Sequence, residues 1–236
     1  MNKHLSFLFI LPLMVTFPLL GQDATVINRT LQDFVSKMRF GGNEQVRDNT
    51  GRNNSTVEGS EYLDDKFVEG DLITQNSERY SGVPIRYNAY NDNIEVKLPD
   101  GKIYLVADKQ IISQVKFNDN ILIYTKYLST QGEKRGFLFV LYAGECLLYR
   151  RNWKEFKAGI PSNGIVSEIP SRIVDKPEEF YIRIKEKLPM IINSKKDLLW
   201  LLQDHSAEIE DFLKKENVKI NDDHDLIKVL SYYDSL

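Results

Sequence analysis

Short β-type runs separated by very short turns constrain the fold of this chain more than any other feature. Between residues 83 and 149 the runs are interrupted by clusters of turn-forming residues, namely Asn91-Asp92-Asn93, Pro99-Asp100-Gly101, Asn118-Asp119-Asn120 and Ala143-Gly144-Glu145. A parallel crossover needs about a dozen residues or more, whereas antiparallel neighbours can be joined by tight turns of this kind. The spacing therefore predicts an antiparallel meander.

Two of these runs differ in how they should be buried. Residues 83–98 alternate apolar and polar side chains on both sides of the turn at 91–93, which is typical of a hairpin with one buried face. The run Phe137–Tyr142 is apolar throughout and predicts a strand that is buried on both faces. Something must therefore cover the second face of that strand.

The C-terminal residues offer such a cover, because their apolar positions recur at helical spacing. Ser194 and Asp222 are predicted N-caps, each followed three residues later by an acid. The sequence thus predicts an α+β fold: a curved antiparallel sheet over residues 59–192, like a meander or half-barrel, with a helical segment over 193–236 packed on one face.

The first 21 residues have the layout of a secretory signal peptide. Lys3 and His4 precede an apolar run, Leu5–Leu20, which ends in small and polar residues. Two prolines interrupt this run, and it is shorter than the roughly 20 apolar residues of a spanning helix. We therefore expect an exported protein, periplasmic in the first instance and fully secreted as the alternative, with no integral membrane span in the mature chain.

Residues 22–58 separate this leader from the β domain. Apolar residues at helical spacing predict a short amphipathic helix over Ala24–Met38. A stretch rich in Gly, Asn, Arg and Thr follows and predicts a flexible polar linker.

Charge and cysteine content exclude several classes of partner and chemistry. The chain has 31 Lys and Arg against 34 Asp and Glu, well mixed, so no basic patch predicts binding to nucleic acid or to anionic lipid. Cys146 is the single cysteine, so no intramolecular disulfide can form. Because Cys146 lies in an apolar run, a small core residue is favoured over a nucleophile.

No motif for metal, cofactor or catalysis survives inspection. Asn221, Asp223 and Asp225 match the start of a calcium loop, but Leu226 stands where that loop needs glycine. Acids clustered at a helix N-terminus explain them better, and His224 has no second histidine on the same predicted helix. We expect no cofactor, no metal and no identified catalytic residue. The chain has 34 acids, and a pair of them could serve in glycoside cleavage. The absence of any catalytic motif nevertheless favours a protein that is not an enzyme.

The candidate binding residues lie on the first hairpin. Arg86, Asn88 and Tyr90 share the face opposite the apolar one, and together they offer a guanidinium, an amide and a phenol that could recognise a sugar or a peptide. Asp92 would shape the adjacent turn. The alternative is a solvated strand face on which Arg86 pairs with Glu95 across the hairpin.

Four segments, Glu58–Leu63, Val83–Asp92, Ser194–Leu199 and Asp225–Tyr233, resemble uncharacterised exported proteins of Bacteroidetes. The resemblance spans about residues 59–236 and implies an exported chain with a domain that begins near residue 59. That family brings no known activity, ligand or catalytic residue.

These observations favour an exported, non-enzymatic binding or interaction protein of the cell envelope, with a cell-envelope protein or glycan as its partner. Two alternatives remain open. One is a carrier of lipid or another apolar ligand, with a pocket between the sheet and the helices. The other is a hydrolase of cell-envelope polymer that uses a pair of acids.

Overall fold

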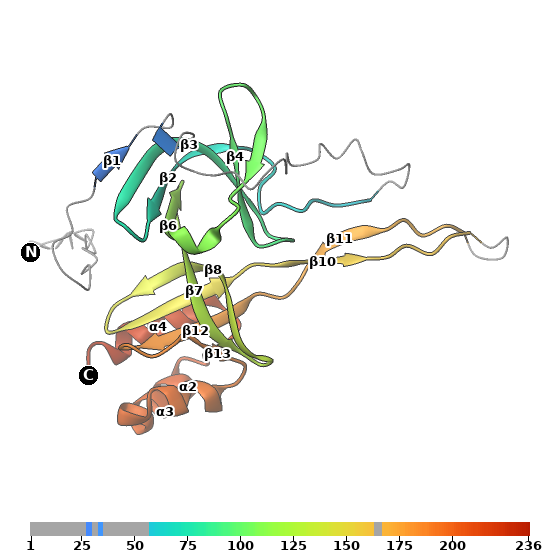
Figure 1. Ribbon diagram of the computed structural model, residues 1–236. Coiled ribbons are helices and arrows are strands. Elements are labelled where there is room, and N and C mark those ends of the chain that lie inside the picture. The colour runs from blue at the N-terminus through green and yellow to red at the C-terminus, as the bar shows by residue number, and fades with distance from the viewer. Residues whose placement is uncertain (1–26, 30–32, 35–56, 163–166) are drawn as a thin grey trace, which may run out of the picture.

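A computed structural model of the chain describes residues 27–29, 33–34, 57–162 and 167–236, and most of these belong to β-strands (Figure 1). The strands of the described residues are β1 (Ile27–Arg29), β2 (Val68–Thr74), β3 (Glu78–Asn88), β4 (Asn93–Lys97), β5 (Ile103–Leu105), β6 (Ile112–Phe117), β7 (Asn120–Ser129), β8 (Gly132–Ala143), β9 (Cys146–Arg151), β10 (Lys154–Lys157), β11 (Arg172–Asp175), β12 (Glu179–Ile184) and β13 (Met190–Ile192). The helices are the 3-10 turns η2 (Lys109–Ile111) and η3 (Gln203–His205) and the α-helices α2 (Lys195–Leu201), α3 (Ser206–Lys215) and α4 (Asp223–Tyr233).

One large sheet contains every described strand except β10 and β11. Its order is β13-β12-β9-β8-β7-β6-β2-β3-β4-β5, and β1 pairs with β3 at the side. All pairs of consecutive strands within this order are antiparallel. The antiparallel meander that the turn spacing predicts is therefore confirmed.

The sheet closes further than the half-barrel expected from the sequence. β13 returns to pair with β7 in parallel at Met190 and Leu128, so β7, β8, β9, β12 and β13 form a closed five-stranded barrel. The Leu128 N–H also donates to the carbonyl of Pro189 at 2.8 Å. The half-barrel expectation is wrong in this respect, because the seam joins segments far apart in the sequence, which local patterning cannot predict.

Buried side chains fill the barrel interior and a second core outside it. Tyr127, Leu138, Tyr149 and Tyr181 form the cluster inside the barrel. On the outer side of β8, Phe137 and Phe139 join a larger cluster with residues of β2, β3, β4 and β6. The expected burial of β8 on both faces is thus confirmed at residues 137–139. The cover there comes from the first half of the sheet rather than from the helices.

The C-terminal helices pack on the outer faces of β9, β12 and β13, and Figure 1 shows α2 and α3 below the barrel. Their contact is a second apolar layer made of the buried residues Cys146, Leu148, Phe180, Ile182, Ile192, Leu198, Leu202, Ile209, Leu213, Val218, Leu226, Val229, Leu230 and Tyr233. Both predicted N-caps are present: the Ser194 hydroxyl accepts from the Asp197 N–H, and the Asp222 carboxylate accepts from the Asp225 N–H. Helices on one face of the sheet are therefore confirmed.

The segment after the expected leader contains a strand where the sequence predicted a helix. β1 runs parallel to β3, with Ile27 opposite Glu78. It pairs with the first part of β3, along the edge that β4 leaves open. The backbone hydrogen bonds available at this edge favour a strand over the helix that the apolar spacing predicts. Asp33 and Phe34 are helical, and the buried Phe34 ring packs edge-on against Tyr80 at 5.3 Å. The predicted signal peptide at 1–21 and most of the predicted helix and linker lie outside the described residues.

None of the helices in the described part of the chain combines the length and the apolar character needed to cross a membrane.

β10 and β11 form a separate antiparallel hairpin that reaches away from the barrel (Figure 1). The bridge between Ile160 and Ile169 extends their pairing. We call residues 154–162 and 167–175 the arm. This element follows from no sequence expectation above, although Phe156, Ile160, Ile169 and Ile173 are spaced symmetrically about its tip.

Candidate functional site

Arg86, the first residue of the predicted binding row, lies in an almost fully enclosed ion pair. It stands opposite Glu95 in the β3–β4 register and donates to the Glu95 Oε2 from Nη2 at 2.6 Å and from Nε at 3.2 Å. Its guanidinium lies between two rings, with Cζ 3.4 Å from the Tyr62 centroid and 4.4 Å from that of Phe67. The Arg86 side chain is 12% exposed and that of Glu95 is 1% exposed. The pairing expected in the alternative interpretation is present, but in a buried setting.

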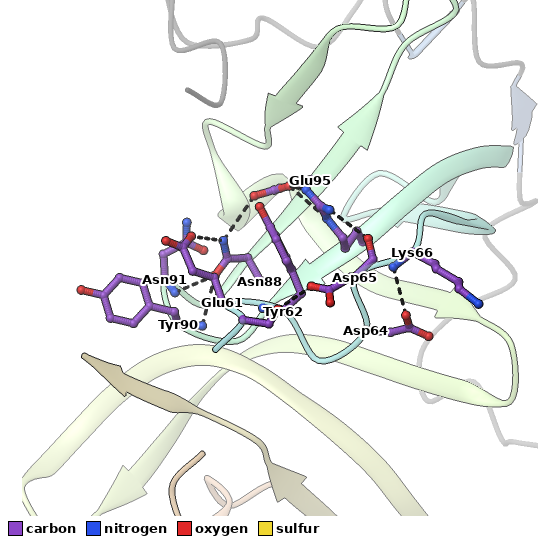
Figure 2. A network of polar contacts seen from close by, with 11 residues as sticks. Glu61, Tyr62, Asp64, Asp65, Lys66, Asn88, Tyr90, Asn91 and Glu95 are labelled. Atoms are coloured by element: carbon purple, nitrogen blue, oxygen red, sulfur yellow. Dashed lines mark hydrogen bonds and ion pairs between the residues drawn. The ribbon is translucent and has the colours of Figure 1, made fainter. Parts of the chain in front are cut away.

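Asn88 completes this network and is itself buried. Its Nδ2 lies 3.2 Å from the Glu61 Oε2 and 3.2 Å from the Glu95 Oε1, so one amide bridges two carboxylates. Its Oδ1 accepts from the N–H groups of Tyr90 and Asn91, both at 3.1 Å. Figure 2 shows these contacts converging on Asn88 and Glu95. Both ends of the amide are therefore engaged within the protein.

Residues 58–67, which we call the cover segment, lie over the strand face that the sequence left solvated. The Glu61 carbonyl accepts from the N–H groups of Ala89 and Tyr90, and the Arg86 Nη1 donates to the Asp65 carbonyl at 2.9 Å. Burial, helped by the nearby Glu95 carboxylate, raises the pKa of Tyr62 to about 12. The Tyr62 hydroxyl is therefore uncharged at physiological pH, and its ring covers one side of the Arg86 guanidinium.

The side chains of the other two predicted residues lie apart from this network. Tyr90 is 40% exposed, and its ring projects away from Glu95 in Figure 2. Asp92 has the left-handed φ of 52° that a tight turn needs, as expected for a turn-shaping residue. Its carboxylate accepts from the Tyr87 hydroxyl at 2.8 Å and from the Phe137 N–H at 3.3 Å. The structure therefore brings Arg86 and Asn88 together, leaves Tyr90 at the margin and turns Asp92 toward the core.

Exposed apolar side chains concentrate on the arm and at the place where it joins the rest of the protein. We call this place the root of the arm; it includes the cover segment and the β3–β4 turn, which are hydrogen-bonded to the arm. Five of the eight exposed large apolar residues of the described chain belong there, namely Leu63, Tyr90, Phe156, Ile160 and Ile169. The Lys154 N–H donates to the Ala89 carbonyl at 3.2 Å, and the Ile173 N–H donates to the Glu58 carbonyl at 2.8 Å. The arm, the cover segment and the β3–β4 turn are thus tied together by backbone hydrogen bonds.

The charges of the arm are paired near its root and unpaired further out. Lys154 forms an ion pair with Asp175 at 3.1 Å, and Lys176 pairs with Glu155 at 2.7 Å. Lys157 and Arg172 are exposed and stand directly opposite one another in the register. Among the described residues neither cation has an ion-pair partner. Like charges in this position repel, so an anionic group from outside would stabilise them.

Other clusters match the plainer interpretation made from the sequence. Oxygen and nitrogen atoms of Asp222, Asp223 and His224 lie within 4.8 Å of one another, but Asp222 caps α4 and Asp223 is bonded to Arg150. Burial raises the pKa of Cys146 to about 12, which suits a core residue rather than a nucleophile.

An open hollow of about 490 Å³ lies beside the start of β3, and among its lining residues Glu78 is the single acid. It is lined by Thr74, Gln75, Asn76, Glu78, Tyr80, Gln110 and Ile111. A hydrolytic site of the two-carboxylate type would need a second acid from elsewhere.

Comparisons with protein-family models, with curated proteins and with solved structures found no match to this chain.

Proposed function

We propose that this chain is an exported, non-enzymatic interaction protein of the cell envelope, and that the arm and its root form the surface that contacts a cell-envelope protein. The observation that carries the proposal is the concentration of exposed apolar side chains there, five of the eight in the described chain. Apolar groups left in water at one place are typical of surfaces that a partner covers. Tyr90 is the residue of the predicted row that this surface includes.

The buried network supports a non-enzymatic role. Glu61 and Glu95 are two acids held close together, since each places an oxygen 3.2 Å from the same Asn88 nitrogen. A general acid or base must reach the substrate within hydrogen-bond distance. Glu95 is 1% exposed and is held by Arg86, so its carboxylate serves the fold.

Packing between the barrel and the helices supports an interaction protein over a lipid carrier. A carrier would hold its ligand between these layers, where the structure has closely packed side chains such as Leu148, Ile182 and Leu226, each fully buried. A core of this kind supplies stability to the scaffold that presents the arm.

Export is testable on the protein itself. We expect a chain produced in a Gram-negative host with its own leader to reach the periplasm and to begin close after residue 21, because the leader has the charged and apolar regions that the export machinery recognises. Mass spectrometry of the intact periplasmic protein checks this. A cytoplasmic chain that retains residues 1–21 would contradict it.

The contact surface can be tested by photo-crosslinking in the cell envelope. A benzophenone amino acid at Tyr90 or at Ile169 should form adducts with envelope proteins, since both side chains are exposed on the proposed surface. The same probe at Trp200 is the matched control, because Trp200 is 57% exposed but lies on α2, far along the chain from the arm. Equal labelling from all three positions, or labelling from Trp200 alone, would contradict the proposal.

A further inference from the structure

The outer edge of β10 carries backbone groups that β11 does not use. The Ile173 N–H donates to the Glu58 carbonyl, and the Glu58 N–H donates to the Ser171 carbonyl, so this part of β11 turns those groups toward the cover segment. In an antiparallel pair, backbone groups alternate between the two sides of a strand. Phe156 stands opposite Ile173 and therefore directs its own N–H and C=O to the outer edge of β10. Within the described residues, β11 is the one strand that pairs with β10.

The sequence of β10 is complementary to itself when two copies run antiparallel. With Phe156 opposite Phe156, the outward backbone groups of the two residues can exchange both hydrogen bonds. Glu155 of each chain then stands opposite Lys157 of the other. These are non-hydrogen-bonded positions, at which facing side chains lie closest. Each Lys157, which stands opposite Arg172 in the single chain, then faces the Glu155 carboxylate of the partner, which also pairs with the partner's own Lys176.

We infer that the outer edge of β10 binds a second copy of this chain, forming a two-fold dimer through antiparallel pairing centred on Phe156. The inference rests on the proposed function in one respect, that the arm is a contact surface, and it names a second copy as one partner of that surface. The Lys154 N–H is already bonded to Ala89, so strand pairing is confined to the few residues around Phe156.

The expected dimer is weak and sensitive to salt. A short strand pairing buries less surface than a standard stable interface, and such small interfaces belong to transient complexes. The ion pairs at its ends are exposed, so added salt should screen them. We expect dimers at about micromolar protein concentrations and dissociation on dilution.

Two charge reversals test the pairing without removing any apolar group, although Glu155→Lys also removes the ion pair with Lys176 within the chain. Lys157→Glu places two acids opposite each other, and Glu155→Lys places two bases opposite each other. Each variant alone should be monomeric, with dimerisation weakened at least tenfold. An equimolar mixture should form a heterodimer, because the acids of one variant then face the lysines of the other at both positions. Analytical ultracentrifugation of each sample measures this, and circular dichroism verifies that both variants are folded.

Lys214→Glu is the matched control, because it reverses the charge of a lysine that is 68% exposed on α3 and should leave dimerisation unchanged. A wild-type chain that stays monomeric up to high concentration would overturn the inference and would show that Lys154 and Lys157 protect the edge from pairing. A Lys157→Glu chain that dimerises like the wild type, or a mixture that stays monomeric, would also overturn it.

The outcomes separate this inference from the proposed function. Envelope adducts formed at Ile169 of a chain that is monomeric would sustain the interaction function after the dimer has failed. A dimer with no adduct other than one of twice the chain's own mass would sustain the pairing and contradict the envelope partner.

Discussion

Glu95→Gln should lower the free energy of unfolding by about 3 kcal/mol or more, because it removes one partner of a buried ion pair and leaves the other charge uncompensated. Arg86 is enclosed between Tyr62 and Phe67, and its side chain is 12% exposed, so water cannot easily replace the carboxylate. The Asn88 amide also loses a charged acceptor. Urea unfolding followed by circular dichroism measures the change.

Glu133→Gln is the control for this substitution. Glu133 pairs with Lys126 at 2.7 Å, but the two side chains are 49% and 47% exposed, so its loss should cost less than about 1 kcal/mol. The double variant Arg86→Met with Glu95→Gln should cost less than the sum of the single changes, since the two residues share one interaction. Equal costs for Glu95→Gln and Glu133→Gln would show that the network is not a buried structural unit.

Asp92→Ala should be the second most destabilising substitution, with an expected cost of about 3 kcal/mol. It leaves the buried Tyr87 hydroxyl and the Phe137 N–H without their acceptor. It also places alanine at a φ of 52°, where asparagine and aspartate are better tolerated. The carboxylate lies so close to β8 that a Cβ on Gly136 would be 2.5 Å from the Asp92 Oδ2, so position 136 requires glycine as long as Asp92 is present.

Asp92 should also make stability depend on pH. Burial is the largest influence on this carboxyl and raises its pKa above the usual 3.8, against the opposing effect of the Tyr87 hydroxyl. The folded state therefore holds the proton to a higher pH than the unfolded state does. The stability due to this proton is complete below about pH 3.8 and is lost as the pH rises through the raised pKa of the folded state.

Asp92→Asn isolates that contribution, because asparagine keeps the shape and tolerates the left-handed backbone but does not titrate. Urea unfolding of both proteins from pH 3.5 to pH 7 should show the wild type losing stability relative to Asp92→Asn as the pH rises. Parallel curves over the whole range would mean that Asp92 titrates alike in the folded and unfolded states.

The sequence was a good guide wherever a feature depends on neighbours along the chain. The alternation about the turn at 91–93 predicted both the β3–β4 hairpin and the pairing of Arg86 with Glu95, and local cap chemistry predicted the starts of α2 and α4. These features depend on residues within a few positions of one another, so periodicity and turn chemistry are enough to predict them.

What the sequence could not predict depends on contacts between distant segments. The polar face of β3 is buried because residues 58–67 fold over it, and residues such as Ser60, Asp64 and Asp65 look like a solvated loop by composition. The barrel closes because Met190 reaches Leu128. The arm depends on the cover segment, through the hydrogen bonds of Glu58. In each case the deciding partner has no counterpart in the local pattern.

The seam between β13 and β7 has a consequence for the order of assembly. The strands up to β9 are synthesised well before Met190, so the first part of the sheet can form early. The barrel can close only once the chain has been made as far as β13. Contacts between such distant segments are entropically costly to bring together and tend to form late. A chain truncated just before residue 190 should therefore have an open barrel, in which β7 and β12 lack their β13 partner and expose strand edges. Such a chain should be degraded readily by quality-control proteases.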